Sequence, residues 1–105
     1  MRLITEKAVR QWIVDHPSVK AQLTYWLEKI KACTATNFTE LQALFAGVDR
    51  VSVASGKPVM VFNLGHGKSA YRLIAAAIHF DKQRVFALKF LSHAEYDKET
   101  WKAQL

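Results

Sequence analysis

The chain has 105 residues, of which 50% are hydrophobic and 23% are charged, and its formal net charge is +6. The length predicts a single domain over residues 1–105, and the composition excludes a disordered or low-complexity chain. The single cysteine excludes a disulfide framework and a cysteine-rich zinc site. We find neither a signal sequence nor an apolar run long enough to span a membrane. We therefore expect a soluble, cytoplasmic protein without a membrane partner.

The positive charge is concentrated in the middle of the chain. Residues 50–92 contain seven Lys and Arg side chains and one Asp, whereas the segments before and after them are nearly neutral. A local excess of cations attracts polyanions, so this segment is a candidate nucleic-acid-binding region. The alternative is that the charge only keeps the protein soluble.

The first half of the chain is predicted to contain two antiparallel helices and a third, shorter one. Apolar residues recur at helical spacing on both sides of Pro17, which cannot continue a helix but suits the first turn of the next one. The second amphipathic run extends to Ile30. Asn37 then caps the short helix, which Gly47 is expected to end.

Four strands follow, joined by short turns. They are predicted in segments 51–53, 59–62, 71–80 and 84–91. Because sequential strands with short links pair in antiparallel fashion, we expect a four-stranded meander. Ser92 and Glu95 then form a capping box. The terminal helix that follows runs through Tyr96 and Trp101, which completes a fold of the α+β class.

A group of basic and phenolic side chains is the best candidate for a catalytic site in this sequence. Arg72 interrupts an apolar strand, and His93 and Tyr96 lie three residues apart on one side of the terminal helix. Cleavage of RNA needs a base for the ribose 2′-OH, a proton donor for the leaving 5′-oxygen and cations for the negative charge on the phosphorane. His and Tyr can transfer protons, and Arg can supply the charge. These three residues form a candidate catalytic group that requires no metal or other cofactor.

Structural roles are the alternative for each member of this group. Tyr96 can be a core aromatic residue, and His93 can be an ordinary residue of a first helical turn. Arg72 can pair with Asp97 or Glu95, because a cation inside an apolar strand needs a partner.

Three lysines of the basic segment and its loops are candidate contacts to RNA phosphates: Lys57, Lys68 and Lys89. No metal-binding His pair, phosphate-binding loop or nucleophile elbow is found in the sequence. Cys33 is expected to pack as a small hydrophobic residue. His79, on the strand face opposite Arg72, is expected to be a packing histidine or one at the rim of the core.

Four short segments together carry a family resemblance. They are residues 1–5, 61–65, 71–74 and 92–98, the last of which reads Ser-His-Ala-Glu-Tyr-Asp-Lys. These segments resemble HigB-type toxins of the RelE-like superfamily of toxin–antitoxin systems. The resemblance implies two N-terminal helices packed on a curved, mainly antiparallel sheet, with a short C-terminal helix. It also matches Arg72 to the family's strand arginine, His93 and Tyr96 to its C-terminal motif, and Asn63, a candidate RNA contact, to its hairpin Asn.

The resemblance further implies an activity and partners. The activity is endonucleolytic cleavage of mRNA, commonly in the ribosomal A site, which inhibits translation. The partner is a HigA-type helix-turn-helix antitoxin, and the toxin meets operator DNA only through the complex of the two proteins. Segment 65–69 departs from the family pattern because it is longer and lacks the turn Asn. Lys68 lies in this segment and Lys89 has no counterpart in the family pattern, so both remain candidates on charge and position alone.

Two other functions stay open. A non-catalytic RNA-binding module, or an inactive toxin relic that acts through complex formation, predicts salt-dependent RNA affinity without cleavage. An interaction protein would instead bind a partner through its exposed helical face. A neighbouring gene for a small helix-turn-helix protein favours the toxin over both alternatives.

Overall fold

The computed structural model describes residues 1–64 and 72–105, with Arg72 and Leu73 described by their backbone alone. The chain forms helices and one sheet, which confirms the α+β class. In chain order the elements are β1 (Arg2–Leu3), α1 (Glu6–Asp15), the 3-10 helix η1 (Pro17–Val19), α2 (Lys20–Ala32), α3 (Phe38–Leu44), β2 (Asp49–Ser52), β3 (Pro58–Asn63), β4 (Arg72–His79), β5 (Arg84–Ser92), α4 (His93–Lys98) and the 3-10 helix η2 (Thr100–Gln104).

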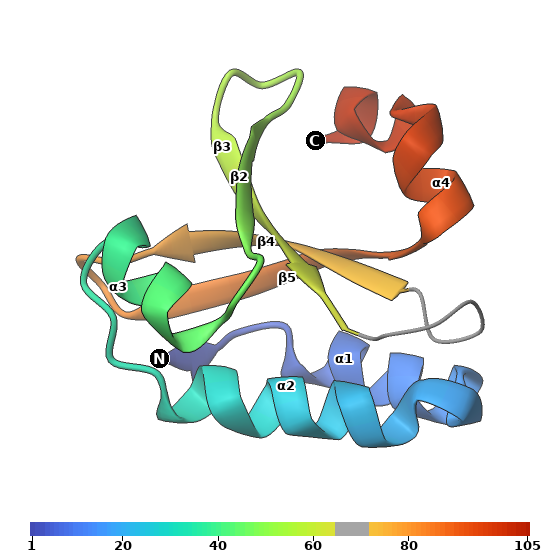
Figure 1. Ribbon diagram of the computed structural model, residues 1–105, viewed down its shortest axis with the longest axis horizontal. Coiled ribbons are helices and arrows are strands. Elements are labelled where there is room, and N and C mark those ends of the chain that lie inside the picture. Colours follow the sequence, from blue (N-terminus) through green and yellow to red (C-terminus); the bar gives the residue numbers. More distant parts are fainter. Residues whose placement is uncertain (65–71) are drawn as a thin grey trace.

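The sheet has five strands in the order β1-β5-β4-β3-β2, so the prediction of four strands was wrong. The additional strand, β1, pairs in parallel with the start of β5, whereas the other neighbours are antiparallel. A strand of two residues shows no periodicity, and its partner lies in the last quarter of the chain, so local sequence pattern does not reveal it. In Figure 1 the β2–β3 hairpin crosses β4 and β5 steeply, as expected for a strongly twisted sheet.

Each face of the sheet carries a hydrophobic core. On one face α1, α2 and α3 pack against alternate strand residues such as Met60, Phe62 and Ile74. On the other face a smaller cluster joins Val61 and its neighbours to Trp101. Figure 1 shows α1 and α2 side by side below the sheet, and α4 on its opposite side. The middle strands are therefore buried on both faces, by the helices and by the C-terminal segment.

A bulge in β5 changes which of its residues face the helices. The pairing with β4 passes from Ala87 to Lys89, so Leu88 is an extra residue. Before the bulge Ala87 belongs to the helical core, and after it Phe90 packs against that core. Lys89 therefore lies on the opposite face, where its ammonium donates to the side-chain oxygen of Gln104 in η2.

The C-terminal segment is divided in two, so the prediction of one helix through Trp101 was wrong. Helix α4 ends at Lys98, and Glu99 adopts a left-handed backbone with a φ of 61°. The change of direction buries Trp101, which is 3% exposed. The indole Nε1 of Trp101 donates to the carbonyl oxygen of Tyr96 at 3.1 Å. Tertiary packing overrides helical spacing here.

A carboxylate joins the two N-terminal helices. Glu6 of α1 lies 2.9 Å from Lys31 Nζ of α2 and 2.7 Å from Arg10 Nη2. Hydrogen bonds from Lys31 and Arg10 lower the pKa of Glu6, and hydrogen bonds from Thr36 lower the pKa of Glu40. Because the folded state binds these protons less tightly than the unfolded chain, the stabilisation is complete above the ordinary glutamate pKa and is lost as the pH falls.

The substitution Glu6→Gln should therefore reduce the acid dependence of stability. We expect the free energy of unfolding to decline less steeply from neutral to acidic pH than in the parent, with Glu40 responsible for part of the remaining decline. Urea unfolding followed by circular dichroism at a series of pH values measures this. The substitution Glu28→Gln, on the exposed face of α2, is the matched control. Equal pH dependence in the parent and Glu6→Gln would contradict the assignment.

Removal of the large Trp101 ring should strongly destabilise the second core. We expect Trp101→Ala to lower the free energy of unfolding by about 3–5 kcal/mol, because it leaves a cavity where a large buried ring was. The substitution Trp101→Phe, which retains most of the packing, should lower it less. Urea unfolding measures both. If Trp101→Ala unfolds at the same urea concentration as the parent, the C-terminal segment does not depend on this contact.

Candidate functional site

Three of the predicted site residues meet at one end of the sheet. Strand β3 ends at Asn63, β4 begins at Arg72, and β5 ends at Ser92, directly before His93. The antiparallel register places Asn63 opposite Leu73 and Arg72 opposite Ser92. Residues that are up to 30 positions apart in the sequence are thereby brought to neighbouring strand ends.

The capping box predicted from the sequence is present at the start of α4. Ser92 Oγ accepts a hydrogen bond from the backbone N–H of Glu95 at 3.2 Å, and Glu95 Oε1 accepts one from the backbone N–H of Ser92 at 3.1 Å. This reciprocal pair fixes the first turn of the helix relative to the end of β5. His93 belongs to that turn, so its backbone is held at the strand end.

The imidazole of His93 is oriented by Asp97. His93 Nδ1 lies 3.0 Å from Asp97 Oδ2, and the two side chains are 48% and 63% exposed. The structure thus pairs Asp97 with His93, whereas the sequence had suggested Asp97 as a partner for Arg72. Asp97 therefore contacts the Nδ1 side of the imidazole ring. The four-residue spacing on a helix was the signal that could have revealed this pair.

Tyr96 has a packing role in addition to any chemical one. Its ring stacks on the Trp101 ring, with centroids 5.6 Å apart and planes 23° apart, and it packs against the second core cluster. The half-buried Tyr96 lies one helical turn beyond His93. Of the two roles left open for Tyr96, the packing role is therefore seen in the structure.

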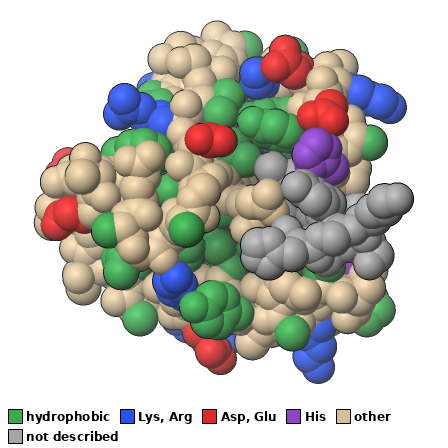
Figure 2. Space-filling view, viewed as in Figure 1, with side chains coloured by type: hydrophobic (Ala, Val, Ile, Leu, Met, Phe, Trp, Pro, Cys, Tyr) green, Lys and Arg blue, Asp and Glu red, His purple; other side chains and the backbone are tan. Residues whose placement is uncertain are grey.

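The predicted RNA-binding lysines do not gather at these strand ends. Lys57 precedes β3, at the opposite end from Asn63, and a strand of six residues spans about 20 Å. Lys89 lies within β5 and contacts Gln104. Lys68, with the unusual segment 65–69, lies outside the described residues, as does the side chain of Arg72. On the face shown in Figure 2, the Lys and Arg side chains are spread over several separate places.

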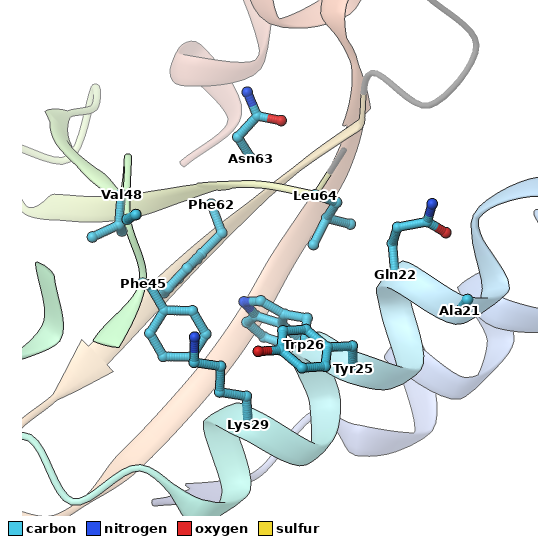
Figure 3. A pocket seen from close by; sticks show the side chains of 11 residues that line it. Ala21, Gln22, Tyr25, Trp26, Lys29, Phe45, Val48, Phe62, Asn63 and Leu64 are labelled. Atoms are coloured by element: carbon cyan, nitrogen blue, oxygen red, sulfur yellow. The ribbon is translucent and has the colours of Figure 1, made fainter. Parts of the chain in front are cut away.

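The side chain of Asn63 lies on the sheet face that carries α4. Phe62 belongs to the core between the sheet and helices α1, α2 and α3, whereas Val61 belongs to the second core with Trp101. Alternation along β3 places Asn63 on the same face as Val61. Figure 3 shows this arrangement, with Asn63 on the opposite side of the strand from Phe62 and Leu64. Asn63 and α4 therefore share one face at one end of the sheet.

Two residues that the sequence assigned to packing are accounted for. Cys33 is 3% exposed in the helical core, which confirms the expected burial. The exposed His79 contacts the Phe86 ring edge-on, with centroids 5.5 Å apart.

Within residues 1–64 and 72–105, no three His, Cys, Asp or Glu side chains are grouped so that they could hold a metal ion. No helix in the described part of the chain is long and apolar enough to cross a membrane.

Comparison with known proteins agrees with the family resemblance seen in the sequence. The model of the HigB toxin family, described as the RelE-like toxic component of a toxin–antitoxin system, matches residues 19–99. No curated protein matches the chain. The matched region runs from the start of α2 to the end of α4 and contains every predicted site residue. Because the match covers most of its length, the chain belongs to the HigB family of RelE-like toxins.

Proposed function

We propose that this toxin is an mRNA endoribonuclease that acts on the translating ribosome in the cytoplasm and needs no metal ion. The proposal is carried by one observation, the meeting of Asn63, Arg72 and His93 at neighbouring strand ends. A toxin of this family implies an antitoxin as partner. We infer that this antitoxin is of the HigA helix-turn-helix type and that operator DNA is bound only by the toxin–antitoxin complex.

The reaction is an attack of the ribose 2′-oxygen on the adjacent phosphorus. The bond between phosphorus and the 5′-oxygen of the next nucleotide breaks, which leaves a 2′,3′-cyclic phosphate and a 5′-hydroxyl. One proton leaves the 2′-OH and one is delivered to the 5′-oxygen. His93 and Tyr96 are the groups proposed for these transfers, and the Arg72 guanidinium is proposed to stabilise the charge that develops on the phosphate oxygens.

The remaining polar residues are proposed to hold the RNA. Asn63 shares the face of α4 and can donate or accept hydrogen bonds with a base or ribose. Lys57, Lys68 and Lys89 are proposed as phosphate contacts, which position RNA without reading its sequence. Because Lys57 and Asn63 lie at opposite ends of β3, a bound RNA that touches both must run along the sheet for several nucleotides.

Arg72→Ala should abolish toxicity while the protein remains folded. Loss of one preorganised donor to the transition state typically reduces the rate about 10²–10³-fold. The measurement is growth after induction, together with mapping of mRNA ends in translating cells. The matched control is Arg84→Ala, at the opposite end of β5 from Ser92, which should stay toxic.

Three results of that experiment have different meanings. A fully toxic Arg72→Ala variant would make Arg72 a structural residue. A parent chain that is harmless and leaves mRNA intact would contradict the nuclease. If that harmless parent still bound RNA with an affinity that falls with salt, the non-catalytic RNA-binding module would be the correct function.

Asp97→Asn should reduce cleavage through His93. The substitution retains the size of the side chain but removes the charge that orients the imidazole, and we expect a decrease of roughly tenfold in rate. In a His93→Gln background the same substitution should have no further effect, because the two residues act as a unit. Glu99→Gln is the control carboxylate in the same segment. Additive losses from Asp97→Asn and His93→Gln would show that Asp97 acts independently of the imidazole.

A further inference from the structure

A cleft opens on the face of β3 opposite the Asn63 side chain. Its volume is about 380 Å³, within the range of small-ligand and side-chain pockets. It lies between α2, the end of α3 and the end of β3, and its walls include the rings of Tyr25, Trp26, Phe45 and Phe62. Figure 3 shows these rings gathered around one space, and Figure 2 shows hydrophobic side chains at the bottom of a hollow on this face.

Apolar groups at the rim of the cleft are exposed to water. Tyr25, which lines the cleft, is 65% exposed although its neighbours Trp26 and Leu27 on α2 are buried. Ala46, which lines the cleft, is also exposed. Exposed apolar groups that cluster around a hollow are typical of a surface that binds another molecule. Aromatic residues such as Tyr and Trp contribute most to the affinity of such surfaces.

The wall of the cleft contains an unsatisfied hydrogen-bond donor. Trp26 is 3% exposed, and within the described part of the chain its indole Nε1 has no hydrogen-bond partner. The Phe62 ring, which meets the indole edge-to-face with centroids 5.4 Å apart, is a weak acceptor at best. In Figure 3 the indole nitrogen is on the side of Trp26 that faces Phe45 and Phe62. Because this nitrogen is itself buried, a carbonyl or carboxylate oxygen of a ligand reaches it only if a side chain of the wall moves.

The charge beside the cleft is positive. Lys29 Nζ lies over the Phe45 ring at 4.8 Å and over the Tyr25 ring at 5.5 Å from the ring centroids. The whole chain carries a formal charge of +6. An occupant with carboxylates next to an apolar side chain is therefore complementary to this surface in both charge and polarity.

We propose that this cleft is the docking site for the antitoxin, which inserts an apolar side chain flanked by acidic residues. The proposal rests on family membership, which supplies the antitoxin, and not on the nuclease activity. The lining favours protein over RNA, because Gln22 and Lys29 are its main polar side chains and the Asn63 side chain points away from it. An aromatic pocket of this size fits the anchor residue of a peptide segment.

The test measures binding of the toxin to the antitoxin encoded by the neighbouring gene. Calorimetry with purified proteins should show that Tyr25→Ala weakens the affinity more than tenfold and that Ala46→Arg, which fills the mouth of the cleft, weakens it further. Val14→Ser is the matched control, because Val14 is 72% exposed on α1 outside the cleft, and it should bind as the parent does. Thermal melting verifies that all three variants are folded.

Three outcomes would overturn the proposal. The first is an unchanged antitoxin affinity in both cleft variants. The second is a loss of single-stranded RNA binding in Tyr25→Ala while antitoxin affinity is kept, which would make the cleft an RNA subsite. The third is a toxin that is dimeric alone and that Ala46→Arg converts to monomer while antitoxin affinity is kept, which would make it a contact between two copies. Because binding is measured without cleavage, a failure of the proposed nuclease activity leaves this test intact.

Discussion

The packing of Trp101 against the sheet determines where the C-terminal segment lies. The buried ring stacks on Tyr96 and contacts the strand residues of the second core. The carbonyl of the next residue, Lys102, accepts a hydrogen bond from the N–H of Ala54 at the β2–β3 turn. Burial of a large ring contributes about 1.5–3 kcal/mol, whereas an exposed ion pair contributes about 0–1 kcal/mol. The His93–Asp97 pair therefore orients one side chain on a helix that hydrophobic packing has already placed.

Strand β3 separates the two surfaces to which we assign functions. Alternation of side chains places Asn63 on the face of α4 and Phe62 on the face of α2. The Asn63 side chain and the proposed antitoxin contact thus lie on opposite sides of β3.

Much of the local structure was determined by the sequence alone, because helix ends and turns depend on neighbouring residues. Pro17 begins the 3-10 helix η1 that leads into α2, as its fixed backbone angle favours. The Asn37 side chain accepts a hydrogen bond from Glu40 N and begins α3. The Ser92 capping box is formed as expected. The family was also determined at this level, since its motifs are short and lie in order along the chain.

Tertiary structure alone decided the features that join distant parts of the chain. Strand β1 exists only because β5 offers it a parallel partner, and no pattern within two residues can indicate that. The break at Glu99 is set by the burial of Trp101 on a sheet face built from other strands. Likewise, the sequence shows Tyr25 only as an aromatic residue on a helix. The cleft beside its ring is formed by residues at the ends of α3 and β3, which the fold brings next to α2. In each case the deciding free energy comes from contacts between segments that are remote in sequence, and local periodicity carries no information about those contacts.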